Sequence, residues 1–93
     1  MFYIYILYSP GADRYYTGYT NDPKRRLAEH NELSTGKYTS KYRPWLLKAV
    51  FPVSEERGVA MQIEKHIKKQ HSREYIESIL DRGNIEKLIE RYS

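Results

Sequence analysis

Residues 2–31 run FYIYILYSPGADRYYTGYTNDPKRRLAEHN, and the order of elements within them governs how the chain folds. The first segment, residues 2–8, is dense in aromatic and β-branched side chains, a composition that favours a largely buried strand. Residues 9–13 (SPGAD) are rich in turn formers, and residues 15–19 (YYTGY) return to the β-favouring composition. We therefore expect the two segments to pair as a β-hairpin.

A helix should follow the hairpin. Asp22 is a good N-cap residue, and Pro23 suits the first helical position because its missing N–H would have no partner there. The predicted helix covers residues 23–31. Arg26 and His30 are four residues apart in it, so they are expected to share one face.

The middle of the chain predicts a loop and a third strand. Residues 32–44 lack apolar periodicity and contain Gly, Pro, Ser and Thr, as surface loops do. Lys37, Lys41 and Arg43 make this loop basic. The apolar run at residues 45–53 is the expected third strand.

Three helices are predicted after this strand. Ser54 is the expected cap of a long helix, and apolar residues in it repeat every four positions, which predicts a face packed on the sheet. Ser72 and Asn84 are expected to cap two shorter helices, with Gly83 ending the first of these. The order ββαβααα predicts one small α+β domain over residues 1–93, in which a short mixed three-stranded sheet is flanked by helices.

Composition excludes several classes of protein. A chain of 93 residues suffices for a single domain, and 40% hydrophobic with 30% charged residues favours a folded chain over a disordered one. The absence of cysteine excludes disulfide frameworks, thiolate nucleophiles and cysteine zinc sites. The longest apolar run, residues 2–8, is far shorter than the roughly 20 residues of a spanning helix. We expect a soluble cytoplasmic protein without a membrane partner.

The basic charge is unevenly distributed. The net charge is +4, and residues 1–54 carry eight Lys or Arg against four acidic residues, whereas bases and acids balance in the remainder. Such a surplus favours a polyanionic partner, although it also fits an ordinary solvated surface. A phosphate-facing surface would therefore lie in the N-terminal part of the chain.

Ten tyrosines are an unusually large number for a chain of this size. Because alternate side chains of a strand point to opposite faces, Tyr5 and Tyr16 should project from the same face of the hairpin. Taken alone, such a pair is best interpreted as packing residues whose hydroxyls reach the rim of the core.

The chain resembles the GIY-YIG endonuclease superfamily, and in particular its small stand-alone bacterial members, which consist of this domain alone and are largely uncharacterised. The resemblance extends from Phe2 to about Lys69. It is carried by Tyr3-Ile4-Tyr5, Tyr16-Thr17-Gly18, residues 22–31, Lys37-Tyr38-Thr39, Arg43-Pro44 and Ile63-Glu64-Lys65. Tyr3 replaces the opening glycine of the first motif and Thr17 replaces an isoleucine of the second, which bears on the subfamily more than on the chemistry.

The resemblance implies a GIY-YIG-like nuclease domain with five catalytic residues. Tyr5 and Tyr16 match the two motif tyrosines, and Arg26, ten residues after Tyr16, matches the helix arginine. His30 occupies a position where relatives carry His or Tyr near the active site. Glu64 matches the glutamate that holds a single divalent ion, Mg²⁺ or Mn²⁺. A hard ion with few protein ligands suits this chemistry, because one carboxylate together with phosphate oxygens can hold it.

The implied activity is metal-dependent hydrolysis of DNA phosphodiester bonds, by nicking or directed by substrate structure, with low sequence specificity. The substrate could be branched, damaged or single-stranded DNA. The residue that takes the proton of the attacking water could be Tyr5, Tyr16 or His30. The expected nucleic-acid contacts are Lys24, Arg25, Lys37, Tyr38, Lys41 and Arg43. The alternatives are a catalytically weak nucleic-acid-binding module of a DNA repair or RNA-processing assembly, and a purely structural domain.

Overall fold

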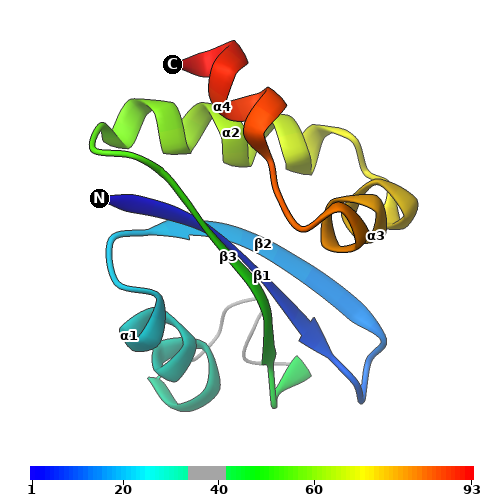
Figure 1. The fold of residues 1–93 in the computed structure, drawn as a ribbon. Coiled ribbons are helices and arrows are strands. Elements are labelled where there is room, and N and C mark those ends of the chain that lie inside the picture. Colours follow the sequence, from blue (N-terminus) through cyan, green and yellow to red (C-terminus); the bar gives the residue numbers. More distant parts are fainter. Residues whose placement is uncertain (34–41) are drawn as a thin grey trace.

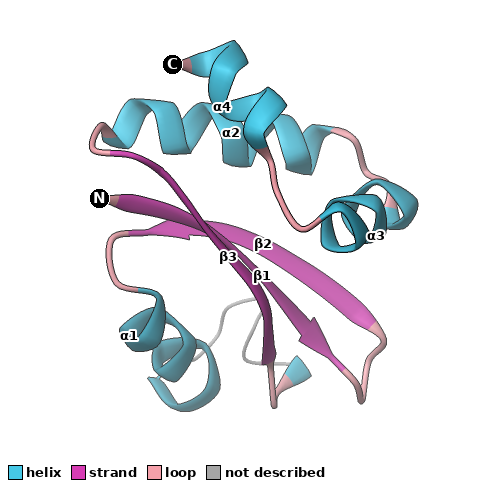
Figure 2. Cartoon of the chain, in the orientation of Figure 1, coloured by secondary structure: helices cyan, strands magenta, loops and turns pink. Residues whose placement is uncertain are grey.

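The computed structural model describes residues 1–33 and 42–93, which form a three-stranded sheet with helices on both of its faces (Figures 1 and 2). The elements are β1 (Phe2–Ser9), β2 (Arg14–Thr20), α1 (Pro23–Ala28), η1 (Glu29–Leu33), β3 (Leu46–Ser54), α2 (Arg57–Lys69), α3 (Arg73–Arg82) and α4 (Glu86–Tyr92). The predicted α+β class and the order ββαβααα are confirmed, with η1 continuing α1 as a π-helical turn.

The sheet has the strand order β2-β1-β3 and is antiparallel throughout, which corrects the expected mixed sheet. Thr20 at the end of β2 pairs with Tyr3, whereas Leu46 at the start of β3 pairs with Tyr8 near the far end of β1. The connecting segment therefore returns the chain to the opposite end of the sheet. As a result β3 and β2 run in the same direction. Because β1 lies between them, neighbouring strands in this sheet are always antiparallel.

Local signals in the sequence set the start of α1 and both ends of α3, whereas the N-cap of α4 is Ile85 rather than the expected Asn84. The Asp22 carboxylate accepts the N–H of Arg25 at 3.2 Å, and Pro23 begins α1 as predicted. Ser72 caps α3, and Gly83 ends it with a left-handed φ of 76°. The long helix α2 begins later than expected, because the hydroxyl of Ser54 accepts the N–H of Glu56 in a turn that precedes the helix.

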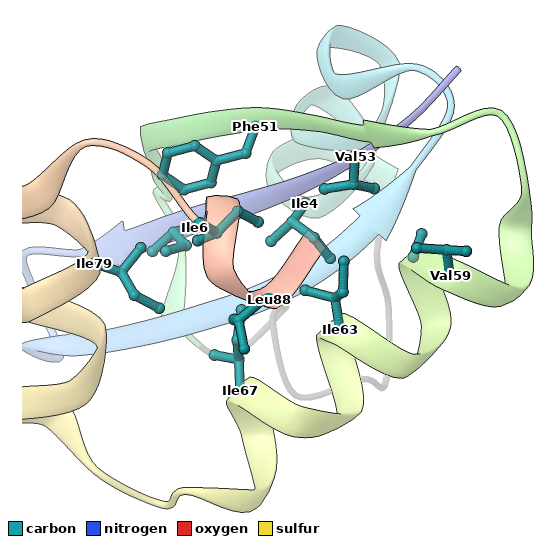
Figure 3. Packing of buried hydrophobic residues seen from close by; sticks show 11 residues of the cluster. Ile4, Ile6, Phe51, Val53, Val59, Ile63, Ile67, Ile79 and Leu88 are labelled. Carbon is teal, nitrogen blue, oxygen red and sulfur yellow. The ribbon is translucent and has the colours of Figure 1, made fainter. Parts of the chain in front are cut away.

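One face of the sheet packs against α2, α3 and α4 (Figure 1). Figure 3 shows side chains of β1, β3 and these helices filling the space between the two layers. The buried members are Ile4, Ile6, Phe51, Val53, Val59, Ala60, Ile63, Ile67, Ile79, Ile85 and Leu88. The four-residue apolar repeat of α2 is thus confirmed as its packing face. In the part of the chain that the structure describes, no helix has the length and apolar character needed to cross a membrane.

The opposite face of the sheet carries a smaller buried cluster of Tyr5, Leu7 and Trp45, with Leu27 of α1 packed against it. Asn31 fixes the approach to β3, because its side-chain amide donates to the carbonyl of Trp45 at 3.1 Å and accepts the Trp45 N–H at 2.6 Å. Tyr5 belongs to this second cluster, and Tyr16 packs against it.

Candidate active site

A pocket of about 320 Å³ lies where β1, β2, α1 and α2 approach one another. It contains four of the five predicted catalytic residues, Tyr5, Tyr16, Arg26 and Glu64, each from a different element. The full lining comprises these four with Phe2, Tyr19, Thr20, Asn21, Arg25, Glu29 and Arg57. Because β2 is an edge strand, side chains from one face of the sheet can meet residues of α2, which covers the other face.

The hairpin register brings the two tyrosines together. Tyr5 pairs with Gly18 and Leu7 pairs with Tyr16, so Tyr5 and Tyr16 are diagonal neighbours on one face, as predicted. Their ring centroids lie 6.4 Å apart with an interplanar angle of 38°. Both phenols therefore belong to one side of the pocket.

Gly18 is required by the position of Tyr5, a role that the sequence analysis did not assign. A Cβ atom added at Gly18 would overlap the phenol oxygen and the adjacent ring carbons of Tyr5. Gly18 in the Tyr16-Thr17-Gly18 motif thus leaves the space that the phenol of Tyr5 occupies. Recognising this from sequence would have required the exact strand register.

Tyr5 is almost completely buried, with 2% of its surface exposed. Its Oη lies 2.8 Å from Nε2 of His30 in a hydrogen bond. Burial raises the pKa of the Tyr5 phenol well above its ordinary value, and the neighbouring Tyr16 adds to the rise, while the charge and a hydrogen bond of Arg26 oppose it. A free phenolate at Tyr5 is therefore disfavoured in the protein as it stands.

His30 lies behind the tyrosine pair rather than in the pocket lining. It belongs to the π-helical turn η1, is 1% exposed, and its ring centroid is 5.0 Å from that of Tyr16 and 5.8 Å from that of Tyr5. Such turns commonly occur at functional sites. The structure thus brings His30 to the site through its bond to Tyr5.

Arg26 is held at the pocket by Glu29, a residue that the sequence analysis did not select. Nη1 of Arg26 donates to Oε1 of Glu29 at 2.9 Å, which raises the pKa of the guanidinium and lowers that of the carboxyl. Their spacing of three residues on a helix was the available signal. Arg25, also in the lining, reaches Oε2 of Glu29 at 3.7 Å and donates to the side chain of Asn21 at 3.3 Å.

Glu64 presents a carboxylate that is 22% exposed on α2. Nζ of Lys68, one turn later, lies 3.7 Å from Oε2 of Glu64 and 4.9 Å from the ring centroid of Tyr16. Lys68 was also missed, although its i,i+4 spacing from Glu64 was visible in the sequence.

The donor set suits a hard divalent ion that takes few protein ligands. Among residues 1–33 and 42–93, no three His, Asp or Glu side chains converge as a metal cage. A single carboxylate with space for water and phosphate oxygens is the arrangement that Mg²⁺ accepts. Of the two carboxylates in the pocket lining, that of Glu29 is bound to Arg26, so Glu64 is the residue that could hold such an ion.

The expected nucleic-acid contacts are only partly described. Lys24 and Arg25 are exposed on α1. Arg43 is exposed as well, and its Nη1 donates to the carbonyl of Asn31 at 3.1 Å. Lys37, Tyr38 and Lys41 lie outside the described residues.

Comparison with known proteins identifies the family. The model of the GIY-YIG catalytic domain matches residues 1–76. A UPF0213 protein of Limosilactobacillus reuteri (strain DSM 20016) is 32% identical over 83 residues, which cover 88% of this chain and 85% of that protein. A UPF0213 protein of Streptococcus pyogenes serotype M5 (strain Manfredo) is 40% identical over 72 residues, 76% of this chain and 75% of that protein. The chain therefore belongs to the GIY-YIG family, a family of nucleases, and its relatives are the small stand-alone UPF0213 proteins.

Proposed function

We propose that the protein is a metal-dependent endonuclease that hydrolyses phosphodiester bonds in DNA. The observation that carries the proposal is that one pocket contains Tyr5, Tyr16, Arg26 and Glu64, although four different elements supply them. The smaller residues of the site serve the same geometry, since Gly18 provides the space that the Tyr5 phenol occupies.

Hydrolysis gathers negative charge on the phosphate oxygens, and Arg26 is suited to stabilise it. A guanidinium stays protonated and offers parallel N–H donors to two oxygens. Glu29 fixes one edge of the group through the 2.9 Å hydrogen bond, which leaves further N–H groups for a phosphate. Fixing the donor before the substrate arrives reduces the reorganisation needed during the reaction.

Glu64 is the proposed ligand of one Mg²⁺ or Mn²⁺ ion. When bound, such an ion supplies Lewis-acid stabilisation of the phosphate and lowers the pKa of its water. The Glu64 carboxylate has the hard oxygen donors that these ions prefer, and it borders the same pocket as Arg26.

Tyr5 and His30 are suited to move the proton of the attacking water. A free phenolate is disfavoured at Tyr5 because burial raises its pKa. A relay avoids that species: the water proton passes to Tyr5 Oη while the phenol proton passes to His30 Nε2, 2.8 Å away. The resulting hydroxide forms a bond to phosphorus, the bond to the leaving sugar oxygen breaks, and that oxygen takes a proton from solvent. A ring nitrogen of histidine can take this proton, and Tyr16 would orient the water or phosphate.

Low sequence specificity is expected because the described residues form one small domain around the pocket, with no second reading domain among them. Nonspecific contacts with the sugar–phosphate backbone would then dominate affinity and make it sensitive to salt. Lys24, Arg25 and Arg43 are exposed residues suited to such contacts.

The test is cleavage of labelled duplex, branched and single-stranded DNA in Mg²⁺. Glu64→Gln and Arg26→Lys should each lower the cleavage rate by about 10²-fold or more, as loss of one preorganised charge-stabilising group does. Glu90→Gln and Arg82→Lys are matched controls, because both residues are exposed on other helices. Equal rates in all four variants would reject the proposed site, and would indicate a contaminating nuclease. DNA binding without metal-dependent cleavage would favour the nucleic-acid-binding module.

A further inference from the structure

We propose that a groove beside the active pocket binds the nucleic-acid strand on one side of the phosphate that is cleaved. The groove lies between β2, the end of α2 and the start of α3, and Lys68 would contact a backbone phosphate where groove and pocket meet. This inference rests on the proposed function, because the strand is the substrate of that activity.

The groove and the active pocket are contiguous. The groove has a volume of about 590 Å³, and Tyr16 lines both it and the pocket. Lys68 lies in the groove lining, yet its Nζ is 3.7 Å from Oε2 of Glu64, which lines the pocket. A strand whose reacting phosphate occupies the pocket can therefore continue into the groove past Tyr16 and Lys68.

The groove has the charge that a polyanionic strand requires. Arg14, Lys68 and Arg73 line it together with His71, against one carboxylate, that of Asp13. Such a surplus attracts phosphate groups and raises the rate of encounter.

Lys68 is the residue best able to change partner when a strand binds. Its side chain is 47% exposed, and its distance of 3.7 Å from Glu64 is longer than a hydrogen bond. Arg73, by contrast, is bound to both Asp13 and Glu77. A phosphate can thus draw the ammonium of Lys68 away from Glu64, because the pair is longer than a hydrogen bond and the lysine is exposed to solvent.

Basic charge alone does not select this groove. A second basic hollow of about 510 Å³ lies between α2 and α4 and includes Lys65, Lys69 and Arg91. None of the described residues that line it also lines the active pocket. A strand in that hollow would not be continuous with the reacting phosphate, so contiguity favours the groove beside β2.

The first experiment measures binding without metal, so that cleavage does not interfere. Fluorescence anisotropy of a labelled single-stranded oligonucleotide is followed as salt increases, for the wild type and for Lys68→Gln, Lys68→Arg and Lys87→Gln. Loss of one phosphate contact should lower the slope of log affinity against log salt by about 0.7 in Lys68→Gln. Lys68→Arg should keep the slope, and so should Lys87→Gln, whose residue is exposed on α4 outside the groove. Equal slopes in both Gln variants would overturn the proposal.

The second experiment locates the strand. A photo-crosslinking benzoylphenylalanine replaces either His71, an exposed residue of the groove lining, or Lys87. Crosslinks to the oligonucleotide are expected at position 71 and not at position 87. Equal crosslinking yields at the two positions would reject a nucleic-acid groove. Displacement of the oligonucleotide by polyglutamate at equal charge concentration would also reject it, and would favour an acidic protein partner.

The outcomes separate this inference from the proposed function. If Lys68→Gln and position 71 behave as expected but no metal-dependent cleavage occurs, the groove stands and the nuclease proposal fails. If Lys68→Gln cleaves and binds like the wild type, the groove fails and the nuclease proposal stands. If the wild type binds no nucleic acid, both are wrong.

Discussion

Replacing Gly18 with alanine tests whether a glycine is needed at this position to leave space for the phenol of Tyr5. The added Cβ would come within 3.0 Å of three atoms of Tyr5, its Oη, Cζ and Cε1. Tyr5 has little freedom to withdraw, because it is 2% exposed and hydrogen-bonded to His30 at 2.8 Å. We therefore expect the ring to leave its preferred rotamer and to weaken that hydrogen bond.

The size of the effect follows from these two losses. A strained rotamer costs about 0.5–1.5 kcal/mol and a hydrogen bond contributes about the same. Overpacking of a dense core falls in the same range, about 1–3 kcal/mol. For a domain of this size, a loss of about 2 kcal/mol lowers the melting temperature by roughly 8–16 °C. Cleavage should fall as well, because the phenol is displaced.

Urea unfolding and thermal melting of Gly18→Ala provide the measurement, with Gly58→Ala as the control. A Cβ at Gly58 meets open space within the described structure, so alanine on α2 should leave stability unchanged or raise it by up to about 1 kcal/mol. The decisive variant carries Tyr5→Leu, which lacks all three overlapping atoms. If Gly18→Ala is as costly in that background as in the wild type, the overlap is not the cause and our reasoning is wrong.

Three further predictions concern the surroundings of the site. His30→Gln retains an acceptor for the Tyr5 hydroxyl but cannot take its proton. The rate of single-turnover cleavage should therefore fall about 10²- to 10⁴-fold, while the melting temperature changes little. An unchanged cleavage rate would reject the relay. Asp13→Asn keeps a residue that tolerates the φ of 54° but removes the carboxylate, whose pKa Arg73 holds below 3.8. The folded state favours the charged carboxylate, so the wild type should be more stable than this variant above pH 3.8 and lose the advantage as the pH falls below it in acid-unfolding curves. Asn31→Ala removes two hydrogen bonds to buried backbone and should lower the free energy of unfolding by about 1–3 kcal/mol in urea titration; a loss below 0.5 kcal/mol would contradict this role.

The sequence predicted those parts of the site that depend on local periodicity. Alternation along two strands placed Tyr5 and Tyr16 on one face, and the cap at Asp22 fixed where α1 begins. Such features need only a period of two, or a pattern within one helical turn, to be recognised.

Features that depend on the packing of distant elements could not be predicted in the same way. Gly18 required the exact partner of Tyr5, and the direction of β3 required knowing which end of the sheet the chain returns to. Lys68 and Glu29 were visible only as helix charge pairs, which are common and usually solvated. Their relation to the pocket depends on how α1 and α2 lie against the sheet.

The core described above does not end where the family match ends. Ile79, Ile85 and Leu88, all beyond residue 76, are buried in it, and the hydroxyl of Tyr92 lies 2.8 Å from Nδ1 of His66 on α2. A recombinant fragment trimmed to residue 76 would lack these side chains and leave part of the core between the sheet and α2 uncovered, so it should aggregate during purification. Expression of this domain therefore calls for α3 and α4 as well.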